Sequence, residues 1–501
     1  MLNTLYFFIE CLLYCLTTVC KHIPFDKYVN FYDSQSISGY CNLCFPHYYS
    51  LPIFSLQIAI IIFIILIAFN KTKSIYQENS QSPMTLDELQ GLFDQEVQSL
   101  IHSHNSDDPA AFAMQFHGRS DLPVRAMAEQ IACRQKAAKK LPALSQHNLL
   151  YTPLALEQSS GERTAEYKAS FMSGNRVIDL SGGLGVDSIF LAKGFQEVVY
   201  CERDPLLCAV VEHNLKQCCI ANVQVKPCES ISLLAEYPDD FFDWIFVDPA
   251  RREEGGRSIA LEAASPDVVA SHDMMLSKAQ KVCIKASPAL EISGLKTLLP
   301  ALHTIIVVSV DRECKEIMLL LDREACEKPV TVNAVCLSSD SEVVIEIVGD
   351  GVVDRPLAFS VKEYFYEPDP AIIKARLSIM LAKDYTLQFV NKSVDYLTSD
   401  HKIAAFPGRT FRVIESVPYK PKSFRGFLNR HAITGASIQR RDFPLSPEEL
   451  RKKFRLLESE RAFLFFTRDR EGHPICIYAL RCFPGDEAAL SGPCQSGGPG
   501  C

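Results

Sequence analysis

The stretch Val177-Ile-Asp-Leu-Ser-Gly-Gly-Leu-Gly-Val-Asp187 joins a short apolar segment to a glycine-rich turn, and a helical pattern follows it. Asp179 ends the apolar segment, and Gly183 and Gly185 follow at even spacing. Glycine suits this place because the backbone must bend sharply and lie against a ligand without a Cβ in the way. The spacing is not the G-x-G-x-x-G of dinucleotide-binding proteins. We expect a strand, a cofactor-binding turn and a helix; an ordinary strand-to-helix turn is the alternative.

Apolar segments typical of strands alternate with helical patterns after this stretch. Strands separated by helices imply right-handed crossovers and a mostly parallel sheet. Ligands of such sheets bind at the carboxyl ends of the strands. The predicted fold class is therefore α/β with a Rossmann-like sheet. The expected strands are residues 198–201, 223–225, 244–247, 282–284 and 305–310.

Carboxylates follow three successive predicted strands. Glu202 ends the second strand, where a carboxylate can accept hydrogen bonds from both ribose hydroxyls of a nucleoside. Glu229 and Ser230 follow the third strand, where Glu229 either accepts from an adenine amino group or caps the next helix. Asp248 and Pro249 follow the fourth strand, where an Asp can hold a nucleophile in line for group transfer, or simply form a turn.

Five motifs together carry a family resemblance, and the small residues Ser181, Gly183 and Gly185 fall two, four and six positions after Asp179. The chain resembles a bacterial family of class I S-adenosylmethionine-dependent methyltransferases with a C-terminal THUMP-like domain, from about residue 86 to residue 483. The five motifs are Asp179-Leu-Ser-Gly-Gly-Leu-Gly-Val-Asp187, Glu202, Asp248-Pro-Ala-Arg-Arg252, Lys285-Ala-Ser-Pro288 and Asp311-Arg-Glu-Cys-Lys-Glu316.

The resemblance implies S-adenosylmethionine as the cofactor and RNA as the expected substrate, and it leaves the RNA target open. Asp248 and Pro249 are then the predicted catalytic residues. The predicted cofactor-binding residues are Asp179, Ser181, Gly183, Gly185, Glu202, Glu229 and Ser230. Further motifs similar to the family's signatures are Glu157-Gln-Ser-Ser160, Thr164-Ala, Tyr167-Lys, Tyr366-Glu-Pro-Asp-Pro-Ala-Ile-Ile-Lys-Ala375 and Phe406-Pro-Gly-Arg409.

The sequence departs from related patterns at two places. Asp-Pro-Ala-Arg lacks the aromatic residue that many amino-methylating enzymes place after Asp-Pro, so Arg251 or Arg252 would stack on a base or hold phosphate instead. Gly161 interrupts a Ser-Ser-Glu run and puts the role of Glu162 in doubt. Methylation of a pyrimidine C5 needs a cysteine nucleophile in a strand-end loop, and the Lys285-Ala-Ser-Pro288 loop has none. A base nitrogen is therefore the predicted methyl acceptor.

The C-terminal region is basic and the body of the chain is acidic. Residues 411–501 contain 15 Lys and Arg against 10 Asp and Glu, while the whole chain has a net charge of −9. Basic residues interleaved with aromatics are typical of RNA-binding surfaces, although a basic patch is often only a solvated face. The predicted RNA contacts there are Lys420, Lys422, Arg425, Arg440 and Arg441.

The resemblance, together with these patterns, implies several regions around an α/β methyltransferase sheet, and the ferredoxin-like and THUMP-like regions rest on the resemblance. The regions are a hydrophobic N-terminal extension (1–83), a helical lead-in (84–170), a class I methyltransferase domain (171–345), a small ferredoxin-like α+β region (346–410), a THUMP-like domain (411–485) and a disordered tail (486–501).

Residues 51–69 are almost uninterruptedly apolar and long enough to cross a bilayer. Lys71 and Lys73 follow directly, so the positive-inside rule would anchor the protein by one helix with its catalytic region in the cytoplasm. Alternatively, residues 1–83 are an upstream extension and a soluble protein starts at Met84, directly before a helix-capping sequence at Thr85.

The 19 cysteines lie mostly in predicted strands and helices, which indicates reduced thiols. Cys41 and Cys44 form one C-x-x-C pair without the second pair that zinc requires, so no metal site is predicted. Two other functions stay open. One is a non-catalytic RNA-binding adaptor that keeps the fold; the other is a nicotinamide dehydrogenase, which the glycine spacing disfavours. The sequence indicates no oligomeric state.

Overall fold

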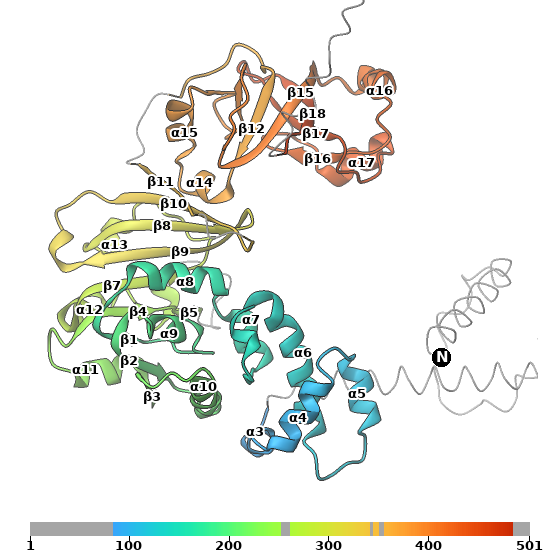
Figure 1. The fold of residues 1–501 in the computed structure, drawn as a ribbon. Helices are drawn as coiled ribbons and strands as arrows, with labels where there is room; N and C mark the ends of the chain where they lie inside the picture. Colours follow the sequence, from blue (N-terminus) through green and yellow to red (C-terminus); the bar gives the residue numbers. More distant parts are fainter. Residues whose placement is uncertain (1–83, 252–260, 341–343, 350–354, 484–501) are drawn as a thin grey trace, which may run out of the picture. The chain divides into compact units, whose positions relative to one another are not determined.

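The computed structural model describes residues 84–251, 261–340, 344–349 and 355–483. The described chain begins with short helices, and Thr85 and Glu88 form the predicted capping box at the start of the first one. The last of them leads directly into the first strand (Figure 1). These helices are α3 (Leu86–Leu92), α4 (Gln95–Ser103), α5 (Pro109–Gln115), α6 (Val124–Lys140), α7 (Pro153–Gln158) and α8 (Glu162–Phe171).

A nine-stranded sheet follows in the order β11-β10-β8-β9-β7-β4-β1-β2-β3. The strands β3, β2, β1, β4 and β7 are parallel neighbours, and β9 runs antiparallel between β7 and β8. This confirms the predicted parallel α/β sheet. The strands are β1 (Gly174–Asp179), β2 (Phe195–Glu202), β3 (Val223–Pro227), β4 (Phe242–Val247), β7 (Ala279–Ala286), β8 (Leu302–Val310), β9 (Glu313–Asp322), β10 (Thr331–Leu337) and β11 (Ile345–Gly349).

The chain leaves β1 for β2 on one side and later returns to β4 on the other side. The carboxyl ends of β1 and β4 therefore flank the topological switch point, where open α/β sheets bind their ligands. A short antiparallel pair follows β4, made of β5 (Ala250–Arg251) and β6 (Ala264–Ser265). The connecting helices are α9 (Val186–Leu191), α10 (Pro205–Gln217), α11 (Ser230–Glu236), α12 (His272–Lys278) and α13 (Leu295–Leu298).

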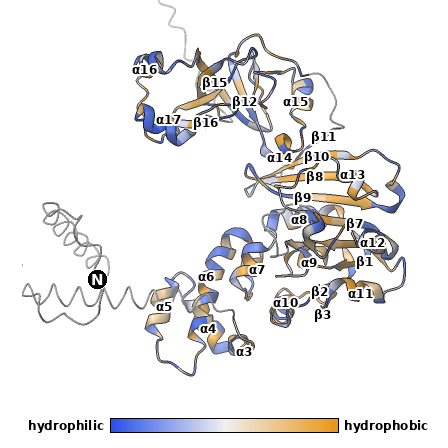
Figure 2. Ribbon diagram, turned by 180° about the vertical axis from the view of Figure 1, so that it is seen from behind, coloured by the Kyte–Doolittle hydropathy of each residue, from blue (hydrophilic) through white to orange (hydrophobic). Residues whose placement is uncertain are grey.

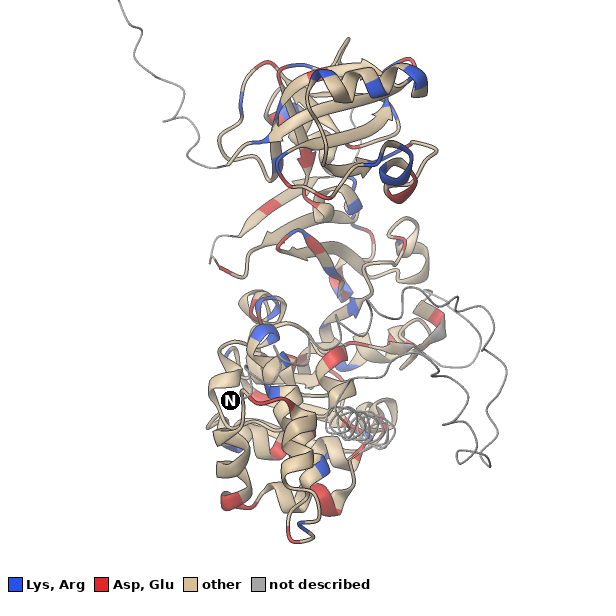
Figure 3. Ribbon diagram, turned by 90° about the vertical axis from the view of Figure 1, so that its right-hand side faces the viewer, with Lys and Arg blue, Asp and Glu red and all other residues tan. Residues whose placement is uncertain are grey.

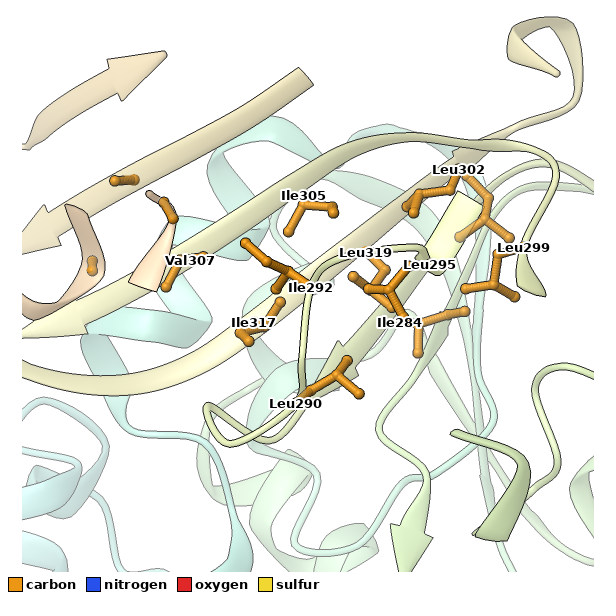
Figure 4. Close-up of a cluster of buried hydrophobic side chains, with 14 of the residues drawn as sticks. Ile284, Leu290, Ile292, Leu295, Leu299, Leu302, Ile305, Val307, Ile317 and Leu319 are labelled. Atoms are coloured by element: carbon orange, nitrogen blue, oxygen red, sulfur yellow. The ribbon is translucent and has the colours of Figure 1, made fainter. Parts of the chain in front are cut away.

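Both faces of the central strands are buried, as expected for a sheet covered on both sides. Ile245 and Ile284 belong to one apolar cluster, whereas their neighbours Phe246 and Cys283 belong to the cluster on the opposite face. In Figure 4 side chains of β7, β8 and β9 pack against Leu290, Ile292 and the α13 segment. The hydropathy colouring in Figure 2 likewise shows mainly hydrophobic strands in this sheet.

A second sheet of seven strands has the order β13-β14-β12-β15-β18-β17-β16. Its strands are β12 (Tyr364–Pro368), β13 (Gln388–Phe389), β14 (Leu397–Ser399), β15 (Gly408–Pro418), β16 (Ser437–Arg440), β17 (Phe463–Arg468) and β18 (Pro474–Arg481). The helices of this region are α14 (Pro370–Lys374), α15 (Ser378–Asp384), α16 (Pro421–Arg430) and α17 (Pro447–Phe454).

Two of the predicted domain boundaries fall inside strands. The boundary at residue 411 lies within β15, which pairs with β12 on one side and with β18 on the other. The boundary at residue 346 lies within β11, which belongs to the first sheet. The regions expected at 346–410 and 411–485 therefore share one sheet, and the domain division itself stays a prediction.

No helix within the described ranges is long and apolar enough to cross a bilayer. The predicted span at residues 51–69, the Cys41–Cys44 pair and the tail at 486–501 lie outside those ranges.

Candidate active site

The glycine turn after β1 depends on glycine for conformation and for space. Gly183 and Gly185 have φ of 54° and 76°, in the left-handed region that favours glycine. A Cβ on Gly182 would come within 2.3 Å of the Tyr200 ring. The Tyr200 hydroxyl donates to the Gly183 carbonyl at 2.6 Å, so the ring supports the turn from β2. Sequence reasoning identified Gly183 and Gly185 but missed the pairing of Gly182 with Tyr200.

Asp179 is buried beneath this turn and holds it in place. Its Oδ1 accepts from the Ser181 N–H at 3.0 Å and from the Ser181 hydroxyl at 3.2 Å, and its Oδ2 accepts from the Ser188 hydroxyl at 2.7 Å. Burial raises the pKa of Asp179 to about 7. Asp179 therefore connects the end of β1 to the start of α9.

Glu202 stands at the carboxyl end of β2 and contacts the same turn. Its Oε2 accepts from the Gly183 N–H at 3.0 Å and its Oε1 accepts from the Asp204 N–H at 2.9 Å. A carboxylate has about four lone-pair sites. The geometry therefore leaves acceptor capacity on both oxygens of Glu202.

Glu229 and Ser230 lie at the carboxyl end of β3, as predicted. The Glu229 side chain is the N-cap of α11, because it accepts from the Ser232 N–H at 2.8 Å. Ser230 is buried in the first turn of that helix. The helix-capping alternative for Glu229 is thus present in the structure, and an adenine contact stays a prediction.

Asp248 follows β4 and is linked to the glycine turn and to a lysine. Its N–H donates to the Ser181 hydroxyl at 2.6 Å. Its Oδ2 accepts from the Lys285 ammonium, which projects from β7. Burial raises the pKa of Asp248, and Lys285 opposes this effect. Burial alone would lower the pKa of Lys285, but the carboxylates of Asp248, Glu316 and Asp187 together raise it. Asp248 and Lys285 form an ion pair.

A buried polar network lies close to the Asp248–Lys285 pair. The Lys168 ammonium from α8 is 2.7 Å from Glu316 Oε1 in β9 and 3.1 Å from Asp187 Oδ1 in α9. The Ser160 hydroxyl accepts from Lys168 at 3.0 Å and donates to Asp187 Oδ2 at 2.7 Å. Burial alone would raise the pKa of Asp187, but the charges of Lys168 and Lys285 and the hydrogen bonds from Ser160 and Lys168 together lower it. The network joins the end of the helical lead-in to the nine-stranded sheet.

Sequence reasoning missed the roles of Lys285, Lys168 and Glu316, although each stands in a quoted motif. Lysine is rarely buried unless it is paired with an acidic group. A lysine at the end of an apolar strand or on the apolar side of a helix could therefore have indicated a buried ion pair. In the motifs that precede the first strand, the Ser159 and Thr164 hydroxyls donate to the nearby carbonyls of Leu156 and Gly161. Glu162 accepts from the N–H groups of Ala143 and Leu144, which gives it a structural role.

The predicted RNA contacts lie in different surroundings. Lys420, Lys422, Arg425 and Arg440 are exposed, whereas Arg441 is half-buried and pairs with Glu367. Lys and Arg are spread over this region with Asp and Glu among them (Figure 3). The backbone of Arg251 lies in β5, and Arg252 is outside the described residues. No group of metal-ligating side chains occurs in the described part of the chain.

Comparisons with known proteins agree with this arrangement. A family described as THUMP domain-like matches residues 408–481. Two strains of Mycobacterium tuberculosis carry an uncharacterised S-adenosylmethionine-dependent methyltransferase that is 24% identical over 362 residues, which is 72% of this chain and 96% of the relative.

A crystal structure from Porphyromonas gingivalis W83, of a protein described as a methyltransferase, matches with a TM-score of 0.70 and 27% identity. The match covers 80% of this chain and all of that one. These findings confirm the resemblance predicted from the sequence, to S-adenosylmethionine-dependent methyltransferases with a C-terminal THUMP-like domain, together with the enzyme class and the cofactor that it implied.

Proposed function

We propose that this protein transfers a methyl group from S-adenosylmethionine to RNA, with the acceptor held at Asp248. The observation that carries the proposal is that the glycine turn, Glu202 and Asp248 follow β1, β2 and β4, which are neighbours in one parallel sheet. The match to a THUMP domain-like family at residues 408–481 and the exposed basic residues of that region support RNA as the substrate.

The residues of the site fit this cofactor. The left-handed Gly183 leaves the turn without a Cβ, and Glu202 keeps lone pairs for two ribose hydroxyls. S-adenosylmethionine supplies a methyl group on a positively charged sulfur, which needs an aligned nucleophile and little covalent help. Asp179 keeps the turn in shape, and Asp248, linked to that turn through Ser181, positions the acceptor.

The predicted acceptor of the methyl group is a base nitrogen. Before the reaction, Asp248 would accept a hydrogen bond from its N–H group. Lys285 occupies Oδ2 of Asp248, so Oδ1 is the oxygen available for an amine. Asp248 would take the proton that the nitrogen releases on receiving the methyl group, and the electron pair of the broken methyl–sulfur bond would stay on sulfur.

The Asp248–Lys285 pair also supports an alternative acceptor of the methyl group, the ribose 2′-hydroxyl. Asp248 would take the proton of that hydroxyl as the oxygen receives the methyl group, and the electron pair of the broken methyl–sulfur bond would stay on sulfur. The Lys285 ammonium stabilises the negative charge that develops on the oxygen. The missing aromatic after Asp248-Pro249 also suits a ribose acceptor, because no flipped base has to be stacked.

Asp248→Ala tests the assignment. We expect methyl incorporation into RNA from cells that lack the protein to fall roughly 10²–10⁴-fold, because the positioning and proton-accepting group is lost. The affinity for S-adenosylmethionine, measured by calorimetry, should change little. Asp239→Ala is the matched control, since Asp239 is exposed and pairs with Lys278.

Full activity of Asp248→Ala would refute the role of Asp248. Absence of cofactor binding by the unaltered protein at millimolar concentration would instead favour the RNA-binding adaptor. Mass spectrometry of the methylated nucleosides separates the two acceptors, because one carries the methyl group on the base and the other on the ribose.

A further inference from the structure

Three of the signature motifs meet around one buried carboxylate outside the active site. Glu367 in β12 accepts from Arg312 Nη2 at 3.1 Å, from Arg409 Nε at 2.7 Å and from Arg441 Nη2 at 2.9 Å. Arg312 comes from the turn between β8 and β9, Arg409 from β15 and Arg441 from the residue after β16. We call Arg312, Arg409 and Arg441 around Glu367 the arginine cluster.

The arginine cluster carries more positive charge than its acidic partners neutralise. Three guanidinium groups pair with Glu367, whose side chain is only 6% exposed, and Asp369 and Arg481 also act on Arg312. The nearby Asp369 is buried, and its Oδ1 is taken by the Ser309 hydroxyl and the Ala371 N–H. Burial lowers the pKa of Arg312 despite the adjacent carboxylate. Excess charge in a partly buried place favours binding of an anion.

Within the described residues the three guanidinium groups make fewer hydrogen bonds than their N–H donors allow. Each arginine has five N–H donors, and both oxygens of Glu367 are already occupied. The Arg441 guanidinium lies 4.7 Å from the Tyr396 ring centroid and that of Arg409 lies 5.5 Å from the Phe411 ring centroid. An aromatic ring thus lies against the guanidinium group of Arg409 and of Arg441, which leaves their N–H edges for polar ligands, and arginine binds phosphate through these edges.

The side chains stay within reach of solvent. Arg312 and Arg441 are each 28% exposed and Arg409 is 19% exposed. Nη1 of Arg312 is covered and makes no hydrogen bond within the described part of the chain, so this guanidinium is under-satisfied by the protein.

Arg312 lies at the same edge of the first sheet as the candidate active site. It follows β8, which is parallel to β7 because β9 is antiparallel to both. Asp248 follows β4, and the order β4-β7-β9-β8 separates the two strands by three inter-strand steps. At about 4.8 Å for each step the two positions are roughly 15 Å apart across the strands, and β8 ends about five residues beyond the level of Asp248, roughly 16 Å along the strand direction, so Arg312 is roughly 22 Å from Asp248. That separation suits a strand that reaches both places.

We infer that the arginine cluster binds a backbone phosphate of the RNA strand close to the methylated nucleotide. The identity of this ligand rests on the proposed function. A contact with phosphate does not depend on the base sequence. The arginine cluster would therefore hold the RNA strand so that the nucleotide to be methylated lies at Asp248.

The test compares the full chain with Arg441→Gln and Arg312→Gln by fluorescence anisotropy on a labelled oligouridylate over a range of salt. We expect each change to weaken binding roughly tenfold, because a charge-assisted hydrogen bond is lost. The slope of log affinity against log salt should fall by about 0.7 for one lost phosphate contact on a single strand. Arg119→Gln is the matched control, since Arg119 is exposed and pairs with Asp121 in the lead-in.

Unchanged affinity and salt slope in both variants, with cooperative melting retained, would show that the arginine cluster is only a structural tie. If the glutamine variants do not fold, Arg441→Lys replaces them; it keeps the charge but loses the planar fork, so we expect reduced affinity. Wild-type affinity in Arg441→Lys would also overturn the inference.

A second arm uses inorganic phosphate. If phosphate raises the melting temperature of the wild type but not of the variants, while RNA affinity is equal in all, the site binds small anions and the inference fails. Failure of the proposed function is seen separately, as absence of RNA binding by the wild type.

Discussion

Asp179 has an environment that differs strongly from that of an Asp in water. It is 1% exposed, and the donors from Ser181 and Ser188 only partly offset the cost of burying a charge, so burial raises its pKa to about 7. The same hydrogen bonds order the cofactor-binding turn. The shape of the cofactor-binding turn therefore depends on the protonation state of the Asp179 carboxyl.

This coupling predicts a pH dependence of stability. An unfolded Asp has a pKa near 3.9, so between about pH 4 and pH 7 the folded chain retains a proton that the unfolded chain has lost. The contribution of the Asp179 carboxyl to the free energy of unfolding must then fall as pH rises through that window, by at most about 1.4 kcal/mol per pH unit. The free energies of unfolding of the wild type and of Asp179→Asn can be measured in urea. From pH 4 to pH 7 the wild type should lose stability relative to the variant, whose amide does not titrate. Parallel curves would contradict the raised pKa.

The glycine turn shows how one element depends on its neighbours. Gly183 and Gly185 need their left-handed φ, which is a property of the turn itself. Gly182 needs its missing Cβ because Tyr200 of β2 lies against it, and Tyr200 also bonds to the next carbonyl. The position of the turn is therefore set by β2 as much as by β1.

Gly182→Ala should weaken cofactor binding more than Gly183→Ala does. The added methyl group on residue 182 would displace the Tyr200 ring and its hydrogen bond. At residue 183 the nearest protein atom is a backbone oxygen at 3.7 Å, so the costs there are the strained φ, about 1–2 kcal/mol, and the Cβ that the cofactor would meet. Calorimetric titration with S-adenosylmethionine measures the difference. Gly426→Ala in α16, where nothing lies within 4 Å, is the control. Equal affinities of the first two variants would refute the role of Tyr200.

Local patterns in the sequence predicted the elements and the strand-end residues. Asp179, Glu202 and Asp248 could be found because each directly follows an apolar strand, and parallel strands bring their carboxyl ends together. The contacts of Asp248 with Lys285 and of Lys168 with Glu316 could not, because they join segments 37 and 148 residues apart. Such pairings depend on the strand order, which a single sequence does not specify.

At the scale of the whole molecule, the second sheet is continuous across the boundary expected at residue 411. The central strand β15 bonds to β12 over Gly408–Arg412 and to β18 over Phe411–Pro418. Phe365 of β12 and Phe411 of β15 are fully buried in one cluster with Phe465 of β17. Residues on both sides of the boundary thus contribute to the same apolar core.

This shared core predicts how fragments of the chain behave. A fragment of residues 411–483 would lack β12, β13 and β14, so the bonding edge of β15 and the aromatic cluster around Phe465 would be exposed to water. We expect it to aggregate or to unfold without a cooperative transition, whereas a chain of residues 84–483 should unfold cooperatively in urea. Circular dichroism against urea concentration measures both. A cooperative transition in the short fragment would show that the boundary at residue 411 separates independent folding units, and that pairing with β12 contributes little to the stability of β15.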